Sequence, residues 1–378
     1  MKVTIREHTP GDDVRPFIRA GHEVFRADPV WVPPLDLEFR DRLDPKKNPF
    51  FQRADVALFT AWRGRRLVGR CSAQVDRGHL RVWNDDTGFF GFFDTIDDEE
   101  AGRALIDAAA TWLRRRGMKR MRGPMSLHVN EEVGILIDGF AAPPVIFMAH
   151  SRPHQARIAE AAGLAKAKDL IAWRYDAGEF PARAIKAWEN VKAMPEVRLR
   201  SVEMRHLERE IEDIMDVYND AWEGKWGVVP PTRAEVAKIA ADLRLILDED
   251  LAFVAEIDGR TVAICIMLPN VNEALAGLRG RLLPTGALRL VWRMKVRHPV
   301  STRLVLLGIR KELRHVKRYG ALSAAMYVEV AKRGIAKGYR WGELSWTRED
   351  DHPINLGIRA MGAIPYKRYR VFEKTIAS

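Results

Sequence analysis

The stretch Arg303-Leu304-Val305-Leu306-Leu307-Gly308-Ile309, with the basic turn from Lys311 to Gly320 behind it, decides the fold of this chain. The apolar run predicts a strand. Apolar residues at helical spacing from Leu322 to Lys337 predict a helix, which Gly338 ends. A helix that begins directly after a strand and a basic turn offers unpaired backbone N–H groups, which suit a pyrophosphate.

The residues that follow predict three further elements. A second strand from Tyr339 to Thr347 carries Glu343 in its middle. A short helix from Asn355 to Met361 comes next, and a last strand covers Tyr366 to Ile376. Gly362 separates these two. The predicted order is therefore strand, basic turn, helix, strand, helix and strand.

This order resembles the C-terminal half of the GCN5-related N-acetyltransferase (GNAT) superfamily. The phosphate loop of that family usually reads Arg or Gln, two residues, Gly, one residue, then Gly or Ala. The loop here, from Arg314 to Leu322, keeps the basic residues but only one glycine. The resemblance implies that this half binds acyl-CoA. It implies a set of CoA-binding residues: Leu313, Arg314, Val316, Lys317, Arg318, Tyr319, Gly320, Ala321, Leu322 and Ser323.

Two further motifs are similar to a subgroup of two-lobed bacterial GNAT-like proteins that includes bacterial ceramide synthases. They are Gly342-Glu343-Leu344-Ser345-Trp346 and Tyr366-Lys367-Arg368-Tyr369-Arg370. The resemblance implies an α/β (α+β) chain with a tandem GNAT-like acyl-CoA N-acyltransferase fold, in which helices flank mixed central sheets. We expect an N-terminal lobe over residues 1–180 and a C-terminal, acyl-CoA-binding lobe over 196–378, with a linker between Glu179 and Val202.

The composition is that of a folded protein with anionic partners. A chain of 378 residues, 47% of them apolar, suffices for two cores of roughly 150 to 190 residues each. Lys and Arg exceed Asp and Glu by 62 to 51, which gives a net charge of +11 and suits CoA phosphates, an acidic bilayer or nucleic acid. The two cysteines, Cys71 and Cys265, fall at matching places in the halves, so we expect no disulfide and a reducing compartment.

No membrane span is expected from the sequence. The first six residues lack an apolar signal core, and no run of about 18 apolar residues occurs. We therefore expect a cytoplasmic protein, with a peripheral position at the inner membrane left open.

The two halves repeat one pattern of elements. Residues 56–73 read as strand, turn and strand, and residues 251–268 read the same way around an Asp-Gly turn. The predicted helix from Ala101 to Arg116 with Gly117 matches the one from Leu322 with Gly338. A repeat that preserves spacing indicates duplication of one α/β unit, although chance similarity is the alternative.

The two copies differ in charge where the helix begins. The N-terminal copy has Ile96-Asp97-Asp98-Glu99-Glu100 there, and these four carboxylates suit the helix dipole but repel a diphosphate. We expect the N-terminal lobe to lack CoA binding and to form a wall of the acceptor cleft.

Amide formation from a thioester has three requirements. The amine must lose a proton, the carbonyl oxygen must be polarised, and the departing thiolate must gain a proton. Glu343 is the first candidate for the base, because a carboxylate in a strand beside a cleft can take a proton directly or through water. Glu312 is the second, with a solvated surface charge as the alternative. Many GNAT enzymes use a tyrosine as the acid where this chain has Ile358. Tyr366 and Tyr327 are the remaining phenols, and Tyr366 is the candidate for the acid. The alternative for either is a core aromatic residue.

Two polar residues lie near the short helix. Asp351 stands where the family often has an asparagine near the CoA arm, and Asn355 lies one turn further on. The resemblance implies that both contact the cofactor. A helix N-cap explains Asp351 equally well.

The segment from Leu278 to Arg297 mixes basic and apolar residues and contains no acidic residue. Such a composition is typical of a segment on an anionic membrane surface, and the lining of an acyl tunnel needs much the same residues. An amphipathic helix packed on its own domain is the alternative.

The histidines and cysteines show no ligand spacing, so no metal is expected. Dispersed positive charge without a helix-turn-helix or zinc pattern argues against nucleic acid. The main hypothesis is transfer of an acyl group, long-chain by the subgroup resemblance, from acyl-CoA to a primary amine such as a sphingoid-type lipid amine. The alternatives are acetyl transfer from acetyl-CoA to a small-molecule or protein amine, and a GNAT-like binding protein without catalysis.

Overall fold

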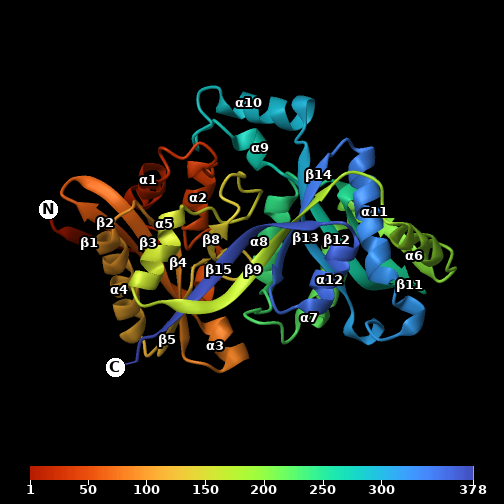
Figure 1. Cartoon of the computed structure of the whole chain (residues 1–378), viewed down its shortest axis with the longest axis horizontal. Helices are drawn as coiled ribbons and strands as arrows, with labels where there is room; N and C mark the ends of the chain where they lie inside the picture. The colour runs from red at the N-terminus through yellow and green to blue at the C-terminus, as the bar shows by residue number, and fades with distance from the viewer. Residues whose placement is uncertain (378) are drawn as a thin grey trace. The chain divides into compact units, whose positions relative to one another are not determined.

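In the computed structural model, which describes residues 1–377, the chain forms two compact units (Figure 1). Unit 1 contains Met1–Leu170, Leu275–Val291 and the chain from Lys367 onward. Unit 2 contains Ile171–Ala274 and Trp292–Tyr366. The division into lobes at residues 180 and 196 stays a prediction.

Unit 1 contains most of the elements of the first half of the chain. In chain order they are β1 (Val3–His8), α1 (Arg15–Val24), α2 (Asp36–Arg42), β2 (Ala54–Arg63), β3 (Arg66–Asp76), α3 (Arg77–Trp83), β4 (Thr87–Thr95), α4 (Glu99–Arg114), β5 (Arg120–Gly123), β6 (Met125–Ser126), β7 (Glu132–Val133), β8 (Ile135–Asp138) and α5 (Pro153–Ala161). Strand β9 (Ala165–Asp176) begins in unit 1 and ends in unit 2.

The sheet of unit 1 has the order β1-β2-β3-β4-β5-β15, where β15 covers Ile364–Thr375. Neighbouring strands are antiparallel except the β4–β5 pair, which is parallel. Helix α4 covers one face because its apolar residues recur at helical spacing. Leu105, Ile106 and Leu113 are buried in the same cluster as Phe90 of β4.

Unit 2 contains the remaining elements. They are α6 (Ala182–Lys192), β10 (Val197–Ser201), α7 (Leu207–Trp222), α8 (Arg233–Leu243), β11 (Ala252–Ile257), β12 (Arg260–Pro269), α9 (Asn272–Leu275), α10 (Gly286–Trp292), β13 (Ser301–Ile309), α11 (Leu322–Ala336), β14 (Trp341–Arg348) and α12 (His352–Ala360). Of these, the end of α9 and most of α10 belong to unit 1.

The sheet of unit 2 runs β14-β13-β12-β11-β10, with β9 next to β14. The β13–β14 pair is parallel and the pairs from β13 to β10 are antiparallel. Helix α11 buries Ala325 and Met326 with Phe253 and Cys265 of the sheet. The elements predicted after Arg303 are all present, within two or three residues of their predicted ends.

The structure repeats the element order of the first half in the second. An antiparallel hairpin (β2–β3, then β11–β12) precedes a long helix, α4 or α11, and each helix is followed by a glycine with positive φ, Gly117 and Gly338. A short helix and a long strand then follow in both halves, separated by Gly163 and Gly362, whose φ angles are 82° and 92°. Only glycine adopts this backbone conformation without steric cost.

The linker predicted between Glu179 and Val202 contains regular structure. Helix α6 and strand β10 lie there, and β10 pairs with β11 at the edge of the sheet. Ala184 of α6 is buried with Val328 and Met361. The prolines on which the linker was predicted lie just outside the two elements, because proline is tolerated where elements begin.

Candidate active site

The parallel strands β13 and β14 are paired over only part of their length. The register joins Ser301 to Trp341 and ends where Leu304 faces Leu344. Both strands continue beyond this point, to Ile309 and Arg348. The carboxyl ends of parallel strands are where ligands of α/β sheets usually bind, so the unpaired part is the place to look for a site.

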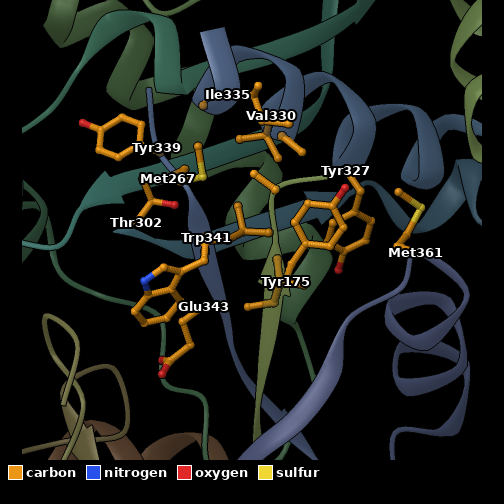
Figure 2. Close-up of a pocket in the computed structure, with 16 residues that line it drawn as sticks. Tyr175, Met267, Thr302, Tyr327, Val330, Ile335, Tyr339, Trp341, Glu343 and Met361 are labelled. Atoms are coloured by element: carbon orange, nitrogen blue, oxygen red, sulfur yellow. The ribbon is translucent and has the colours of Figure 1, made fainter. Parts of the chain in front are cut away.

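A cavity of about 50 Å³ lies in unit 2 beside the paired part of these strands (Figure 2). Its lining is mostly apolar and comes mainly from β9, β12, β13, β14 and α11, with Met361 just after α12. The lining residues are Tyr175, Ala177, Met267, Thr302, Leu304, Tyr327, Val330, Ala331, Gly334, Ile335, Tyr339, Trp341, Gly342, Glu343, Leu344 and Met361. A water molecule needs roughly 10 to 15 Å³ measured in this way, so the cavity has room for a few waters or a short acyl group.

Glu343 is the only acidic side chain in the lining of this cavity. Its side chain is fully buried, although it stands in the middle of a short strand. Figure 2 shows its carboxylate beside the indole of Trp341 at one end of the cavity. Within the described part of the chain, Oε1 of Glu343 has no hydrogen-bond partner. A buried carboxylate oxygen without a donor costs free energy, and a hydrogen bond from a bound group would lower that cost.

Tyr366 supplies the hydrogen bond to the other carboxylate oxygen. Its hydroxyl donates to Oε2 of Glu343, and its ring packs edge-on against Trp341. The structure therefore brings together the two residues predicted as base and acid. Tyr366 is placed by β15, which begins two residues earlier, and not by the short helix.

Arg303 holds the carboxylate from the neighbouring strand. It faces Glu343 in the β13–β14 register, and its Nε lies 4.0 Å from Oε1 of Glu343. The same Nε donates to Oγ of Ser345 at 2.8 Å. The guanidinium is thus directed partly to Ser345, which leaves Oε1 within reach of a proton from a substrate.

Three tyrosines near Glu343 keep their protons at neutral pH. Burial raises the pKa of Tyr175 and of Tyr327, and burial raises the pKa of Tyr339 to about 12. In the described residues, the hydroxyl of Tyr175 is buried without a partner. These phenols are therefore hydrogen-bond donors and not bases.

Glu312 does not lie in this cavity. It belongs to the turn after β13, where it forms a 2.8 Å ion pair with Arg260, and both side chains are more than half exposed. Glu312 therefore lies at the surface as a solvated charge, which was the alternative to its role as a base.

The predicted phosphate loop forms two short 3-10 turns, Lys311–Leu313 and Lys317–Tyr319, before α11 begins. The side chain of Arg314 folds back to donate to the carbonyl oxygens of Ala221 and Ile309, at 2.7 and 3.1 Å. Arg318 forms an ion pair with Glu196. Among the loop cations, Lys317 is exposed and has no ion pair in the residues described.

The first turn of α11 differs from that of α4 as the sequence predicts. Asp98 caps α4, because its side chain accepts from the N–H of Ala101 at 3.1 Å. In the described chain no side chain caps α11, whose first turn contains Leu322 and Ser323. Backbone N–H groups in a first turn have no partner inside the helix, so those of α11 remain available to an anion.

Asp351 and Asn355 lie at the start of α12. Asp351 stands at the N-cap position, but its carboxylate pairs with Lys225 at 3.2 Å and does not cap the helix. The amide of Asn355 donates to the carbonyl of Arg348 at 2.9 Å, and its buried Oδ1 has no partner in the part of the chain described. Neither residue lines the cavity.

The sequence analysis missed several residues of the site. Arg303, Ser345, Trp341 and Tyr175 adjoin Glu343 or line the cavity with it, yet none was a candidate. Arg303 has the only detectable signal, because an arginine at the start of an apolar strand calls for a buried partner. Across the described residues no group of His, Cys, Asp and Glu could hold a metal ion, and no helix has the length and apolar character to cross a membrane.

The sequence and the fold were compared with those of known proteins. The chain is 37% identical over 377 residues to the bacterial ceramide synthase of Caulobacter vibrioides, covering 97% of this chain and 96% of that protein. It is 35% identical over 379 residues to protein YghO of Escherichia coli, covering 98% and 95%. No model of a protein family matches the sequence.

The fold is similar to solved tandem GNAT structures. A tandem GNAT protein from the clavulanic acid biosynthesis pathway superposes with a TM-score of 0.58 at 14% identity, covering 100% of this chain and 99% of the other. The tandem GNAT-like fold and the resemblance to bacterial ceramide synthases, both predicted from the sequence, are confirmed.

Proposed function

Because this chain belongs to the bacterial ceramide synthase family of acyltransferases, we propose that it transfers an acyl group from acyl-CoA to a primary amine. The observation that carries the proposal is the buried carboxylate of Glu343. This carboxylate lies in the lining of the cavity and accepts a hydrogen bond from Tyr366 at Oε2. Its other oxygen, Oε1, has no hydrogen-bond partner among the described residues.

In this proposal Glu343 is the general base. The ammonium form of the amine first loses one proton to solvent. The neutral nitrogen then attacks the thioester carbonyl and gives one proton to Oε1, directly or through one water. Nε of Arg303 lies 4.0 Å from Oε1 and so places a positive charge beside the carboxylate. Collapse of the tetrahedral intermediate forms the amide bond and breaks the carbon–sulfur bond.

Tyr366 is the proposed acid. Its hydroxyl proton goes to the departing CoA thiolate, and the proton that Glu343 took from the amine restores the phenol through their hydrogen bond. Protons balance, because one leaves the neutral amine and one reaches the thiol. Glu312 is not part of this mechanism, because its ion pair lies on the surface.

The proposed CoA site is the loop from Leu313 to Ser323. The free N–H groups at the start of α11 would bind the diphosphate, and the exposed Lys317 would add positive charge. The unpaired edges of β13 and β14 beyond Leu304 and Leu344 would hydrogen-bond the amide groups of the CoA arm, as an added strand does. Asp351 and Asn355 remain proposed contacts of that arm.

The finer proposal is a long acyl chain and a sphingoid-type lipid amine, used at the inner membrane surface. It is supported by the identity to the bacterial ceramide synthase over nearly the whole chain. One observation favours a second candidate, acetyl transfer to a small-molecule or protein amine. The cavity of about 50 Å³ accommodates an acetyl group but not a long chain.

Thiol release from acetyl-CoA and from palmitoyl-CoA, measured with a sphingoid base or with spermidine as acceptor, tests these proposals. We expect turnover of palmitoyl-CoA with the sphingoid base, and its loss in Glu343→Gln. Glu189→Gln is the matched control, because Glu189 is an exposed glutamate of α6 and unit 2 as well. Turnover of acetyl-CoA alone would select the second candidate, and full activity of Glu343→Gln would end the proposed mechanism.

A further inference from the structure

The segment from Leu283 to Arg297, called the exposed helical segment below, presents an unusual number of apolar side chains to solvent. It contains α10, drawn in teal in Figure 1, and continues as a π-helical turn over Arg293–Arg297. Five large apolar side chains are exposed: Leu283 (84%), Leu288 (74%), Val291 (60%), Trp292 (53%) and Val296 (64%). Soluble proteins rarely place so many in one short stretch, so the segment calls for a partner.

The exposure is fixed by the fold and is not that of a frayed end. The N–H of Asp36 in α2 donates to the carbonyl of Gly280 at 2.9 Å, which ties the chain to α2 three residues before the segment begins. Gly286 is buried, and a Cβ there would lie 2.2 Å from the carbonyl oxygen of Arg281. Within α10, Gly286 is buried and Leu290 is partly buried, whereas the remaining residues are exposed.

The charged residues of the sequence around the exposed apolar residues are all basic. Between Glu273 and Glu312 the sequence has no Asp or Glu. Five basic side chains are exposed within this region: Arg279, Arg281, Arg289, Lys295 and Arg297. A partner must therefore offer both negative charge and an apolar interior.

A partner with an apolar surface is either another protein or a lipid bilayer, and Lys295 distinguishes between the two. At helical spacing it falls on the same face as Leu288, Val291 and Trp292. The centre of a protein interface is depleted of lysine, because its charge would lose water. At a bilayer the long side chain can reach the phosphate layer while its neighbours enter the acyl region.

We propose that the exposed helical segment is a docking surface for an anionic lipid bilayer. The segment lies in the plane of the interface, with Leu288, Val291 and Trp292 at the boundary of the acyl chains. Arg289 and Lys295 lie at the level of the lipid phosphates. The proposal concerns binding alone and does not depend on the proposed transfer reaction.

Flotation of the full chain with vesicles, without any substrate, tests the proposal. We expect the protein to float with vesicles that contain phosphatidylglycerol and to remain behind with pure phosphatidylcholine. The double variant Arg289→Glu/Lys295→Glu should lower the partition constant at least 25-fold, since each basic residue near such a surface contributes about fivefold. Leu288→Ser should lower it about tenfold.

Matched controls exist for both changes. Leu245→Ser removes a leucine that is 86% exposed elsewhere, and Arg65→Glu reverses an exposed arginine in the turn between β2 and β3. Both controls should float as the wild type does, and circular dichroism should show all variants folded. The proposal is overturned if the wild-type protein remains in the unbound fraction with both kinds of vesicle, phosphatidylcholine and phosphatidylglycerol. The proposal is also overturned if the protein is a dimer that Leu288→Ser dissociates while flotation is unchanged, because the segment is then a protein interface.

Discussion

The hydroxyl of Tyr366 donates a hydrogen bond to Glu343, a fully buried carboxylate whose second oxygen, Oε1, has no hydrogen-bond partner among the described residues. The two residues lie on different strands, β15 and β14, and 23 positions apart in the chain. This pair joins a proton acceptor to a proton donor at one end of the cavity.

Tyr366→Phe should lower kcat by about 10- to 100-fold and leave KM nearly unchanged, if the phenol acts as the acid. Unfolding should become easier by about 1 to 3 kcal/mol, because the buried carboxylate loses a donor. Rates of thiol release and urea unfolding measure the two effects. Should kcat stay at the wild-type value while only stability falls, Tyr366 has a structural role.

Glu312→Gln should leave thiol release within about twofold of wild type and stability within about 0.5 kcal/mol. Its carboxylate forms an exposed ion pair with Arg260, and such pairs contribute little. The same assay on both glutamates separates the two predicted bases. A large loss of activity in this variant would show that the turn after β13 takes part in the reaction.

Lys317→Ala should raise KM for acyl-CoA about five- to tenfold with kcat preserved, because it removes one phosphate-binding charge. The effect should shrink at high salt, since an exposed charge is screened. Arg65→Ala, at an exposed arginine of unit 1, is the control for net charge. Equal effects of the two variants would argue against a phosphate site at this loop.

Two glycines of unit 2 should respond to alanine in opposite directions. Gly308→Ala should destabilise the fold by about 1 to 3 kcal/mol, because a Cβ there would lie 2.2 Å from the ring of Trp222. Gly357 lies in α12 with open space around it, so Gly357→Ala should stabilise by about 0.5 to 1 kcal/mol. Thermal unfolding of both variants measures the difference.

Stability should fall as the pH decreases below about 6.5. Burial lowers the pKa of His79 and of His150, although Asp85 and Asp28 oppose the shift. The unfolded chain then binds protons at a pH where the folded chain does not, so acid favours unfolding, by at most about 1.4 kcal/mol per pH unit for each histidine. His79→Phe should flatten the dependence, measured by urea unfolding between pH 5.5 and 7.5, whereas His206→Phe, at an exposed site, should not.

The local elements of the second half could be predicted because their signals are local. The apolar run before Ile309, the helix that Gly338 ends and the different charge at the starts of α4 and α11 all depend on residues close in sequence. Apolar periodicity, glycine at positive φ and side-chain capping act within one or two turns, so a single sequence reveals them.

What the sequence by itself determined was therefore the order of elements, their repetition and Glu343 as the first base candidate. Only the tertiary structure decided which side chains meet Glu343. Arg303 reaches it through the register of β13 and β14, and Tyr366 through the path of β15. It also separated Glu312, on the surface, from Glu343, in the cavity. Strand register and burial depend on pairing between distant segments, and no local pattern specifies them.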